Sequence, residues 1–282
     1  MAMPMTPNSL NPLNWLEPLL ERAAVLANEA IPLAAPEEVY LGVDLGTSDV
    51  VTMAVDAEGT PLAVCLEWAD VVRDGVVLNF VEAARIVRQQ IAQIEARLKT
   101  RFTHAATSFP PGTDPRISAN VIEAVGLQVS EIIDEPTAVA RLLGIEQGAV
   151  VDIGGGTTGV AVIENGKVVY SGDEATGGHH VTLCLAGALK TSLEEAQNFK
   201  HQRGKEAWPI VRPVFEKMTD IVQAHLGTRA DVDTLYLSGG SCALPGVQSL
   251  FASAFPGIDV ILPQPCLYLT PLAIASSARS AA

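Results

Sequence analysis

Basic residues are scarce in this sequence. Its 18 lysines and arginines stand against 32 aspartates and glutamates, which gives a formal net charge of -14 at pH 7. Such a surface repels phosphate backbones and anionic lipids, so the composition argues against a nucleic-acid partner and against docking on a membrane. Hydrophobic residues make up 48% of the chain and charged residues 18%, which is enough apolar material for a sizeable core and too little charge for disorder.

Cysteine is also sparse, and its spacing excludes common metal and redox motifs. The four cysteines contain no Cys-x-x-Cys pair, which favours buried thiols in a reducing compartment. No early apolar run is long enough for a signal peptide, and no stretch reaches the ~18 uninterrupted apolar residues of a membrane span. We therefore expect a cytosolic protein.

Short apolar segments separated by turns dominate the chain from about residue 39. The pattern predicts two β-meanders, each followed by alternating helices and strands, and Asn165-Gly166 is a typical hairpin turn. Strands are expected at 39–45, 50–55, 62–66, 104–109, 127–133, 150–153, 159–164, 167–170, 234–237 and 259–262, and helices at 81–99, 117–125, 136–143, 181–190, 193–200, 211–226 (with Pro213 in its first turn), after Gly240 as far as Phe255, and from Pro271.

A helix is also expected ahead of the first strand, from Trp15 to about Ala30, with Asn14 as its cap. Its apolar residues fall on one face, which either packs on its own domain or docks on a partner. Pro32 and Pro36 follow the helix and separate it from the rest of the chain. We therefore expect the helix to dock on a partner protein and to be dispensable for ligand binding.

One unit of the pattern occurs twice. Val43-Asp44-Leu45-Gly46 is followed by Thr47, Ser48 and a valine-rich strand, and Val151-Asp152-Ile153-Gly154 is followed by Gly155, Gly156, Thr157, Thr158 and another valine-rich strand. Self-similarity at domain-sized spacing predicts two related lobes that face each other.

The repeated unit suits a polyphosphate. Turns of small residues direct backbone N–H groups into one concavity, and their hydroxyl groups add donors for phosphate oxygens. The aspartates are expected to hold a hydrated Mg²⁺, an ion that usually keeps several waters. The pattern differs from a P-loop and from a dinucleotide-binding fingerprint, because a strand follows the glycines and no Gly-Lys-Ser/Thr is present.

Six segments in order resemble the motifs of the actin-like ATPase superfamily, which includes actin, the DnaK-type chaperones and bacterial cell-shape and division ATPases. They are the two phosphate loops (LGVDLGTSDV, 41–50; VDIGGGTTGV, 151–160), the connecting segments (IIDEPTAVA, 132–140, and 270–276), the Gly-Gly turn (SGDEATGGHHV, 171–181) and the adenosine motif (LSGGSCALPGV, 237–247). The segments WADVVRDGVVLNF (68–80) and ATSFPPGTDP (106–115) further resemble the chaperone-like members of ethanolamine utilisation, which are encoded with bacterial microcompartments.

The resemblance implies a two-lobed α/β actin-like fold with a duplicated β-meander/helix core, a reduced inserted subdomain, and ATP or ADP with Mg²⁺ between the lobes. We expect an N-terminal tail and helix at 1–36, a first lobe at 37–150, a second at 151–269 and a closing helix at 270–282. The implied site places Asp44 and Asp152 on the water shell of Mg²⁺, Glu135 and Asp152 on the attacking water, and the nucleotide against Gly46, Thr47, Ser48, Gly154, Gly155, Gly156, Thr157, Thr158, Gly177, Gly178, Lys200, Gly239 and Gly240.

The chain departs from the chaperone pattern in four places. The segment from Asp56 to Val81 holds no lysine to reach the γ-phosphate, and Gly159 replaces an acidic residue after the second loop, so hydrolysis is expected to be slow. Gln197 replaces a glutamate at the ribose. The adjacent His179 and His180 follow the Gly-Gly turn, where we expect hydrogen bonds near the phosphates in preference to metal ligation.

Three function classes fit such a fold: a chaperone or reactivating factor, a small-molecule kinase, and a filament-forming ATPase. The resemblance to the ethanolamine-utilisation members favours the first, with an enzyme of that process or a microcompartment shell component as the protein partner. Fold analogy alone does not decide between them.

Overall fold

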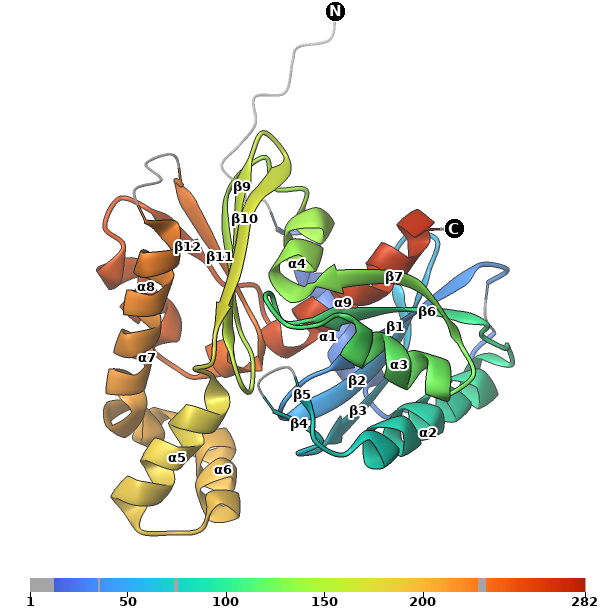
Figure 1. Cartoon of the computed structure of the whole chain (residues 1–282), viewed down its shortest axis with the longest axis horizontal. Coiled ribbons are helices and arrows are strands. Elements are labelled where there is room, and N and C mark those ends of the chain that lie inside the picture. Colours follow the sequence, from blue (N-terminus) through green and yellow to red (C-terminus); the bar gives the residue numbers. More distant parts are fainter. Residues whose placement is uncertain (1–12, 35, 74–75, 228–231, 282) are drawn as a thin grey trace, which may run out of the picture.

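The computed structural model describes residues 13–34, 36–73, 76–227 and 232–281, and it contains two lobes side by side (Figure 1). Each lobe is built on a five-stranded sheet. The first sheet contains β1 (Val39–Leu45), β2 (Asp49–Asp56), β3 (Pro61–Trp68), β6 (His104–Phe109) and β7 (Gln128–Asp134), and the second contains β8 (Gln147–Ile153), β9 (Thr158–Glu164), β10 (Lys167–Glu174), β11 (Thr234–Ser238) and β12 (Asp259–Ile261).

The two sheets share one topology. Their strand orders are β3-β2-β1-β6-β7 and β10-β9-β8-β11-β12. In each sheet the first three strands form an antiparallel meander and the last two run parallel to the first strand. The predicted duplication and the α/β class are confirmed.

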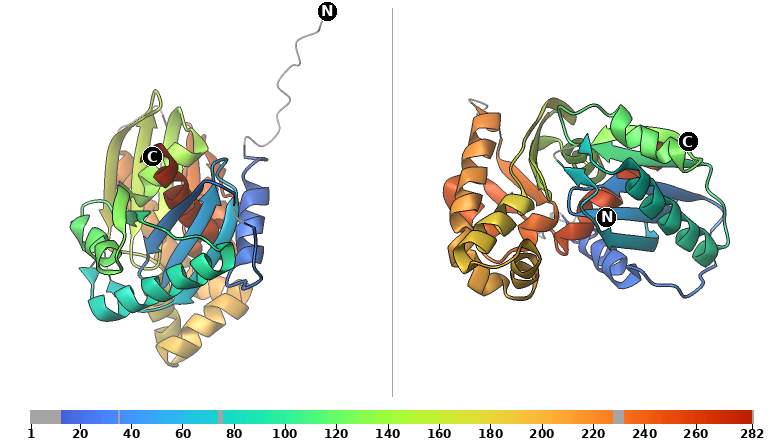
Figure 2. Two further views of the ribbon diagram at one scale, coloured as in Figure 1. Left: turned by 90° about the vertical axis from the view of Figure 1, so that its right-hand side faces the viewer. Right: turned by 60° about the horizontal axis from the view of Figure 1, so that its bottom comes forward.

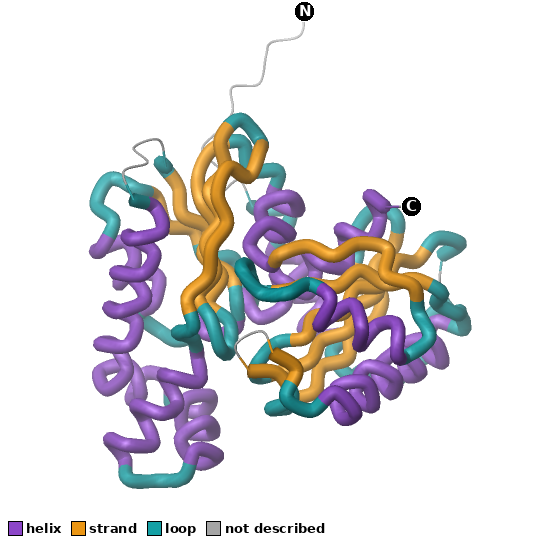
Figure 3. The backbone as a smooth tube through the Cα atoms, viewed as in Figure 1, coloured by secondary structure: helices purple, strands orange, loops and turns teal. Residues whose placement is uncertain are grey.

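Helices cover both faces of each sheet. α2 (Phe80–Leu98) and α3 (Arg116–Ala124) lie on the outer face of the first sheet, and α7 (Gly204–Leu226) and α8 (Val247–Ala254) on the outer face of the second. α4 (Glu135–Leu143) and α9 (Leu269–Ser277) occupy the space between the sheets (Figures 1 and 3). Because each follows the last strand of its sheet, they are equivalent elements of the two copies.

Strand residues alternate between these layers, as period-two side chains must. In β2, Val51 and Met53 face the central core between the sheets, whereas Val50 and Ala54 face the outer core of the first lobe. Both faces of the central strands are therefore buried, which accounts for their nearly continuous apolar runs.

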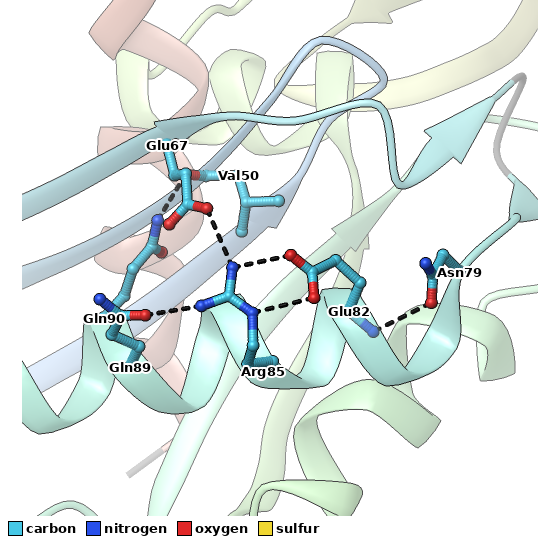
Figure 4. Close-up of polar contacts among 7 residues, drawn as sticks. All are labelled: Val50, Glu67, Asn79, Glu82, Arg85, Gln89 and Gln90. Carbon is cyan, nitrogen blue, oxygen red and sulfur yellow. Dashed lines mark hydrogen bonds and ion pairs between the residues drawn. The ribbon is translucent and has the colours of Figure 1, made fainter.

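The helix expected at 81–99 is confirmed as α2 (Figure 4). Asn79 caps it, since its side chain accepts a hydrogen bond from the Glu82 N–H at 3.1 Å. Arg85 pairs with Glu82 and Glu67 in an exposed cluster of low energetic value. The buried Gln90 contributes more, because its amide donates to the Val50 carbonyl oxygen at 2.8 Å and so ties the helix to β2.

The expectation that the N-terminal helix docks on a partner is wrong for its apolar face. The observed helix, α1 (Glu17–Leu26), buries Leu16, Leu20 and Ala23 completely in the central core. Figure 2 shows α1, in blue, against the first sheet. The segment after it is also attached: Asn28 exchanges two hydrogen bonds with the Leu66 backbone.

Other elements differ from expectation at their limits. α7 begins at Gly204 and contains both Pro209 and Pro213, so Pro213 is not in its first turn. Burial of Ala207 and Val211 extends the helix toward its N-terminus and outweighs the cost of the prolines. The pattern also missed the small hairpin of β4 (Val72–Arg73) and β5 (Val76–Val77).

Two further helices and three 3-10 helices complete the part of the chain that the structure describes: α5 (Gly178–Leu189), α6 (Leu193–Gln202), η1 (Gly240–Ala243), η2 (Cys266–Tyr268) and η3 (Ala278–Ala281). Figure 1 shows α5 and α6 below the second sheet, beyond the end of α7. Within the described residues, no helix combines the length and apolar character that a membrane span requires.

Candidate functional site

The two repeated turns meet across the space between the lobes. The first connects β1 to β2, and the second connects β8 to β9. They are so close that a Cβ atom on Gly155 would lie 2.2 Å from Ser48 Oγ and 2.8 Å from Ser48 N. Only glycine fits at this approach, so Gly155 allows the loops of the two lobes to touch.

A cavity of about 720 Å³ opens beside this contact. It brings together most residues that the sequence singled out, from both lobes. The expected residues that line it are Asp44, Gly46, Thr47, Ser48, Glu135, Asp152, Gly154, Gly155, Gly156, Thr157, Gly178, Lys200, Gly239 and Gly240.

Two residues that the sequence predicted for the site, Thr158 and Gly177, do not line the cavity. Thr158 is fully buried, and its hydroxyl donates to the Thr176 carbonyl oxygen at 2.6 Å, so it is turned into the sheet. Its expected role as a phosphate donor is not supported by this placement. Gly177 also lies outside the lining, and its N–H donates to His180 Nδ1 at 3.2 Å.

The Gly-Gly turn instead braces the second loop from behind. The Gly178 N–H donates to the Gly154 carbonyl oxygen at 2.9 Å, and the His179 N–H donates to that of Gly155 at 2.7 Å. Both carbonyl groups are thereby paired with N–H donors of the turn. The Gly154 N–H is paired as well, with the Thr157 carbonyl oxygen at 3.1 Å, so the remaining N–H groups of the loop are the natural donors toward an anion.

Carboxyl groups from both lobes converge at the loop end of the cavity. Desolvation, together with the charges of Asp49 and Asp152, raises the pKa of Asp44 to about 8. Desolvation and the charge of Asp152 raise the pKa of Asp49 to about 6. Desolvation also raises the pKa of Glu135 well above its usual range, and the charges of Asp44 and Asp152 add to this effect. These groups disfavour one another's ionised forms and would gain from a cation.

Asp152 is held by groups from distant parts of the chain. Its Oδ2 accepts hydrogen bonds from the hydroxyl groups of Ser238, at 2.7 Å, and Thr270. These bonds oppose the rise in its pKa that burial causes. Asp44 has one such support, from the Ser108 hydroxyl at 3.2 Å.

A fifth carboxyl group, that of Asp173, lies near the site but does not line the cavity. It sits on β10 directly opposite Gly159, and a Cβ atom on Gly159 would lie 3.5 Å from its Oδ1. That oxygen is buried without a hydrogen-bond partner. Desolvation raises the pKa of Asp173 to about 7, against the effect of a hydrogen bond from Thr157. An acidic side chain thus lies opposite Gly159 on the neighbouring strand, outside the lining of the cavity.

α6 contributes a cation to the lining of the cavity, and the turn after β11 contributes small residues. Lys200 Nζ donates to Thr182 Oγ1 at 2.8 Å and to the Gly178 carbonyl oxygen at 3.2 Å, and burial lowers its pKa to about 8. Gly239 has a φ of +87°, and a Cβ atom there would lie 2.4 Å from the Ile153 carbonyl oxygen. The backbone of this turn therefore packs directly against the end of β8.

The donor set fits magnesium held through water. Among the described residues, no three His, Cys, Asp or Glu side chains converge closely enough to hold a metal ion directly. Carboxylates at the loop end can accept hydrogen bonds from a hydrated ion, which is the usual state of bound Mg²⁺. His180 caps α5 by accepting the Gly177 N–H at a point outside the lining of the cavity, and hydrogen bonding of the histidine pair near the phosphates stays a prediction.

The sequence pattern missed several residues of the site. Asp49 follows the first loop immediately and could have been recognised as a second acidic residue. Ser238, Thr270 and Asp173 lie in recognised segments (237–247, 270–276 and 171–181), but their contacts with other site residues arise only through the fold.

Known proteins resemble the chain along most of its length. Ethanolamine utilization protein EutJ of Escherichia coli is 58% identical over 268 residues, which cover 95% of this chain and 96% of that protein. The crystal structure of EutJ from Carboxydothermus hydrogenoformans superposes with a TM-score of 0.88 at 42% identity, and covers 93% of this chain and 98% of that one.

More distant matches agree on the fold. The family model for cell division protein FtsA matches residues 149–278, and the model for MreB/Mbl protein matches residues 66–194. MreB 5 of Spiroplasma citri, solved with AMPPNP bound, superposes with a TM-score of 0.63 at 16% identity, and covers 85% of this chain and 95% of that one. The fold is that of the actin-like ATPases, and the chain belongs to the EutJ family of ethanolamine utilization proteins.

Proposed function

We propose that this chain binds ATP and ADP with Mg²⁺ in the cavity between its lobes. The observation that carries the proposal is the contact of two phosphate-type loops, one from each lobe, beside a group of mutually destabilised carboxyl groups. A polyphosphate with its cation supplies both the anion that the loop N–H groups need and the positive charge that the carboxylates need.

Each wall of the cavity then has a task. The loop N–H groups and the hydroxyl groups of Thr47, Ser48 and Thr157 hold phosphate oxygens, and Asp44 and Asp152 hold the water shell of Mg²⁺. Glu135, together with Asp152, orients water near the terminal phosphate. The nucleoside lies against Gly239, Gly240 and Lys200. Turnover by the chain alone is slow, because no lysine between Asp56 and Val81 reaches the phosphates.

The decisive experiment is calorimetric titration of the full chain with MgATP and MgADP, in parallel with the same nucleotides in EDTA. Asp152→Asn should weaken binding roughly tenfold or more in Mg²⁺ and have little effect in EDTA, since it removes a charged acceptor for the metal's water. Asp259→Asn, at the exposed start of β12, is the matched control. Absence of binding by the wild-type chain at millimolar nucleotide would contradict the proposal.

In the cell we propose a cytoplasmic, chaperone-like role in ethanolamine utilisation. Family membership supports this setting, and the partner we propose is an enzyme of that process or a microcompartment shell component, engaged according to nucleotide state. The assignment of residues 37–150 and 151–269 to two functional lobes, with 1–36 and 270–282 as flanking segments, is part of this proposal, except that the second lobe begins with β8 at Gln147, because that whole strand lies in the second sheet. A small-molecule kinase and a filament-forming ATPase stay the alternative predictions for the function of this fold.

A further inference from the structure

Two aromatic rings meet across the mouth of the cavity. Trp68 ends β3 in the first lobe, and His201 lies on α6 in the second. Their ring centroids are 5.1 Å apart with an angle of 58° between the planes. Both residues line the cavity, and Trp68 is 52% exposed, so the contact lies where the cavity opens to solvent.

The Trp68 side of this contact is fixed to the first loop. Trp68 pairs with Asp49 in the β2–β3 ladder, and the next residue, Ala69, donates its N–H to the Ser48 carbonyl oxygen at 3.1 Å. Ser48 is the residue that touches Gly155 of the second loop. The indole position therefore follows the position of the first loop.

The His201 side is fixed to the second loop by a chain of hydrogen bonds. Gln197 Nε2 lies 3.0 Å from His201 Nε2, and Gln197 Oε1 accepts from Thr182 Oγ1 at 2.6 Å. Lys200 joins Thr182 to the Gly178 carbonyl oxygen. Gly178 in turn donates to Gly154 of the second loop.

These contacts form a closed circuit around the cavity: loop to loop at Ser48 and Gly155, and lobe to lobe at Trp68 and His201. Both contacts join the two lobes beside the cavity, so the lobes cannot separate around a ligand while both contacts hold. The rings are joined by van der Waals and edge electrostatic attraction, a weak contact that can open and re-form.

We propose that Trp68 and His201 form a gate that retains a nucleoside polyphosphate in the cavity and must part before it can leave. The inference rests on the proposed function, since it needs a nucleotide in this cavity. Its consequence is kinetic: the gate slows both entry and release, so its removal changes the rates more than the equilibrium affinity.

The test is stopped-flow measurement of binding and release of a fluorescent ADP analogue, with Mg²⁺, on the full chain. Trp68→Ala and His201→Ala should each speed release roughly 3- to 10-fold, the range expected for loss of one aromatic contact. Association should also become faster. The double variant should match the single ones, because either substitution removes the same contact.

Two matched variants control for non-specific effects. Trp68→Phe keeps an aromatic ring at the gate and should release the analogue at nearly the wild-type rate. Trp15→Ala removes another exposed tryptophan that does not line the cavity and should change neither rate. Unchanged release in Trp68→Ala overturns the gate. Faster release with unchanged association also overturns it, because this outcome identifies Trp68 as a simple wall that contacts the ligand.

A measurement without nucleotide separates failure of the gate from failure of the proposed function. In a Trp15→Phe/Trp208→Phe background, Trp68 is the remaining tryptophan of the 3 in the chain. Its emission should change when His201→Ala removes the neighbouring ring. No change means that the rings do not meet in solution, and the gate is overturned. A change in emission, with no analogue bound by any variant, overturns nucleotide binding and with it the gate's role.

Discussion

Buried carboxyl groups set the chemistry of the cavity at the scale of single residues. Asp44, Asp49 and Glu135 have no side-chain cation at hydrogen-bonding distance within the described part of the chain, and each has a raised pKa. Such groups cost stability when they ionise in a closed site. A bound cation would remove this loss of stability, because it favours the ionised carboxylates. Clusters of carboxyl groups with raised pKa values are typical of ligand-binding sites.

Asp173 allows this cost to be measured. In the unfolded chain its carboxyl group ionises near its ordinary pKa of 3.8, whereas in the folded protein it keeps its proton until about pH 7. The folded state therefore binds more protons between these values, and the free energy of unfolding falls as pH rises from about 4 to about 7. Above pH 7 this contribution no longer changes.

We predict that Asp173→Asn stabilises the protein more at pH 8 than at pH 5. Asparagine cannot ionise, so the variant avoids the loss, and the difference between the two pH values should be roughly 2 kcal/mol. Urea denaturation at both pH values measures it. Glu174→Gln, the exposed neighbour on the same strand, should show little such difference. An equal effect of Asp173→Asn at both pH values would contradict the assignment.

At the scale of elements, α1 shows how a correct pattern led to a wrong conclusion. Its apolar face was recognised from the sequence, but periodicity does not say what covers that face. The cover is the first lobe itself, in which Leu16 and Leu20 contact the central core. Prolines that follow a helix end the helix, but they do not prevent it from packing on the core of its own domain.

Leu20→Ala should lower the free energy of unfolding by about 2 to 4 kcal/mol, because it leaves a cavity in a fully buried layer. Val25→Ala, on the same helix at a position that is 77% exposed, should change it by less than about 0.5 kcal/mol. Chemical denaturation of the two variants makes the comparison. If both substitutions have the same small effect, α1 does not pack in solution as described.

Local patterns predicted the order of elements well, because hairpins and amphipathic helices are encoded by neighbouring residues. They could not predict register. A symmetrical hairpin around Asn165-Gly166 would set Gly172 opposite Gly159, whereas an irregularity between Val168 and Tyr170 shifts the pairing to Asp173. One extra residue in the strand thus placed a carboxyl group opposite Gly159, behind the residues that line the cavity.

For the whole molecule, the duplication explains why part of the site could be predicted. Each copy carries its own loop, and a loop is a local feature that the sequence displays directly. The supports of the site come from elsewhere: Thr270, at the start of α9, reaches Asp152 on β8, 118 residues earlier in the chain. Contacts of this kind depend on how distant elements pack, and the contact of the two loops depends on how the two copies face each other, which no segment of the sequence encodes alone.

The contact between Gly155 and Ser48 allows a test of how the two copies of the repeated unit face each other. Gly155→Ala would place a methyl group 2.2 Å from Ser48 Oγ, so the loops must move apart. We predict roughly tenfold or greater loss of MgATP affinity by calorimetry, with the fold retained by circular dichroism, because a small misplacement of positioning groups is costly. Gly187→Ala, at an open position in α5, should leave affinity unchanged and add up to about 1 kcal/mol of stability. Wild-type affinity in Gly155→Ala would show that the loops do not need to touch.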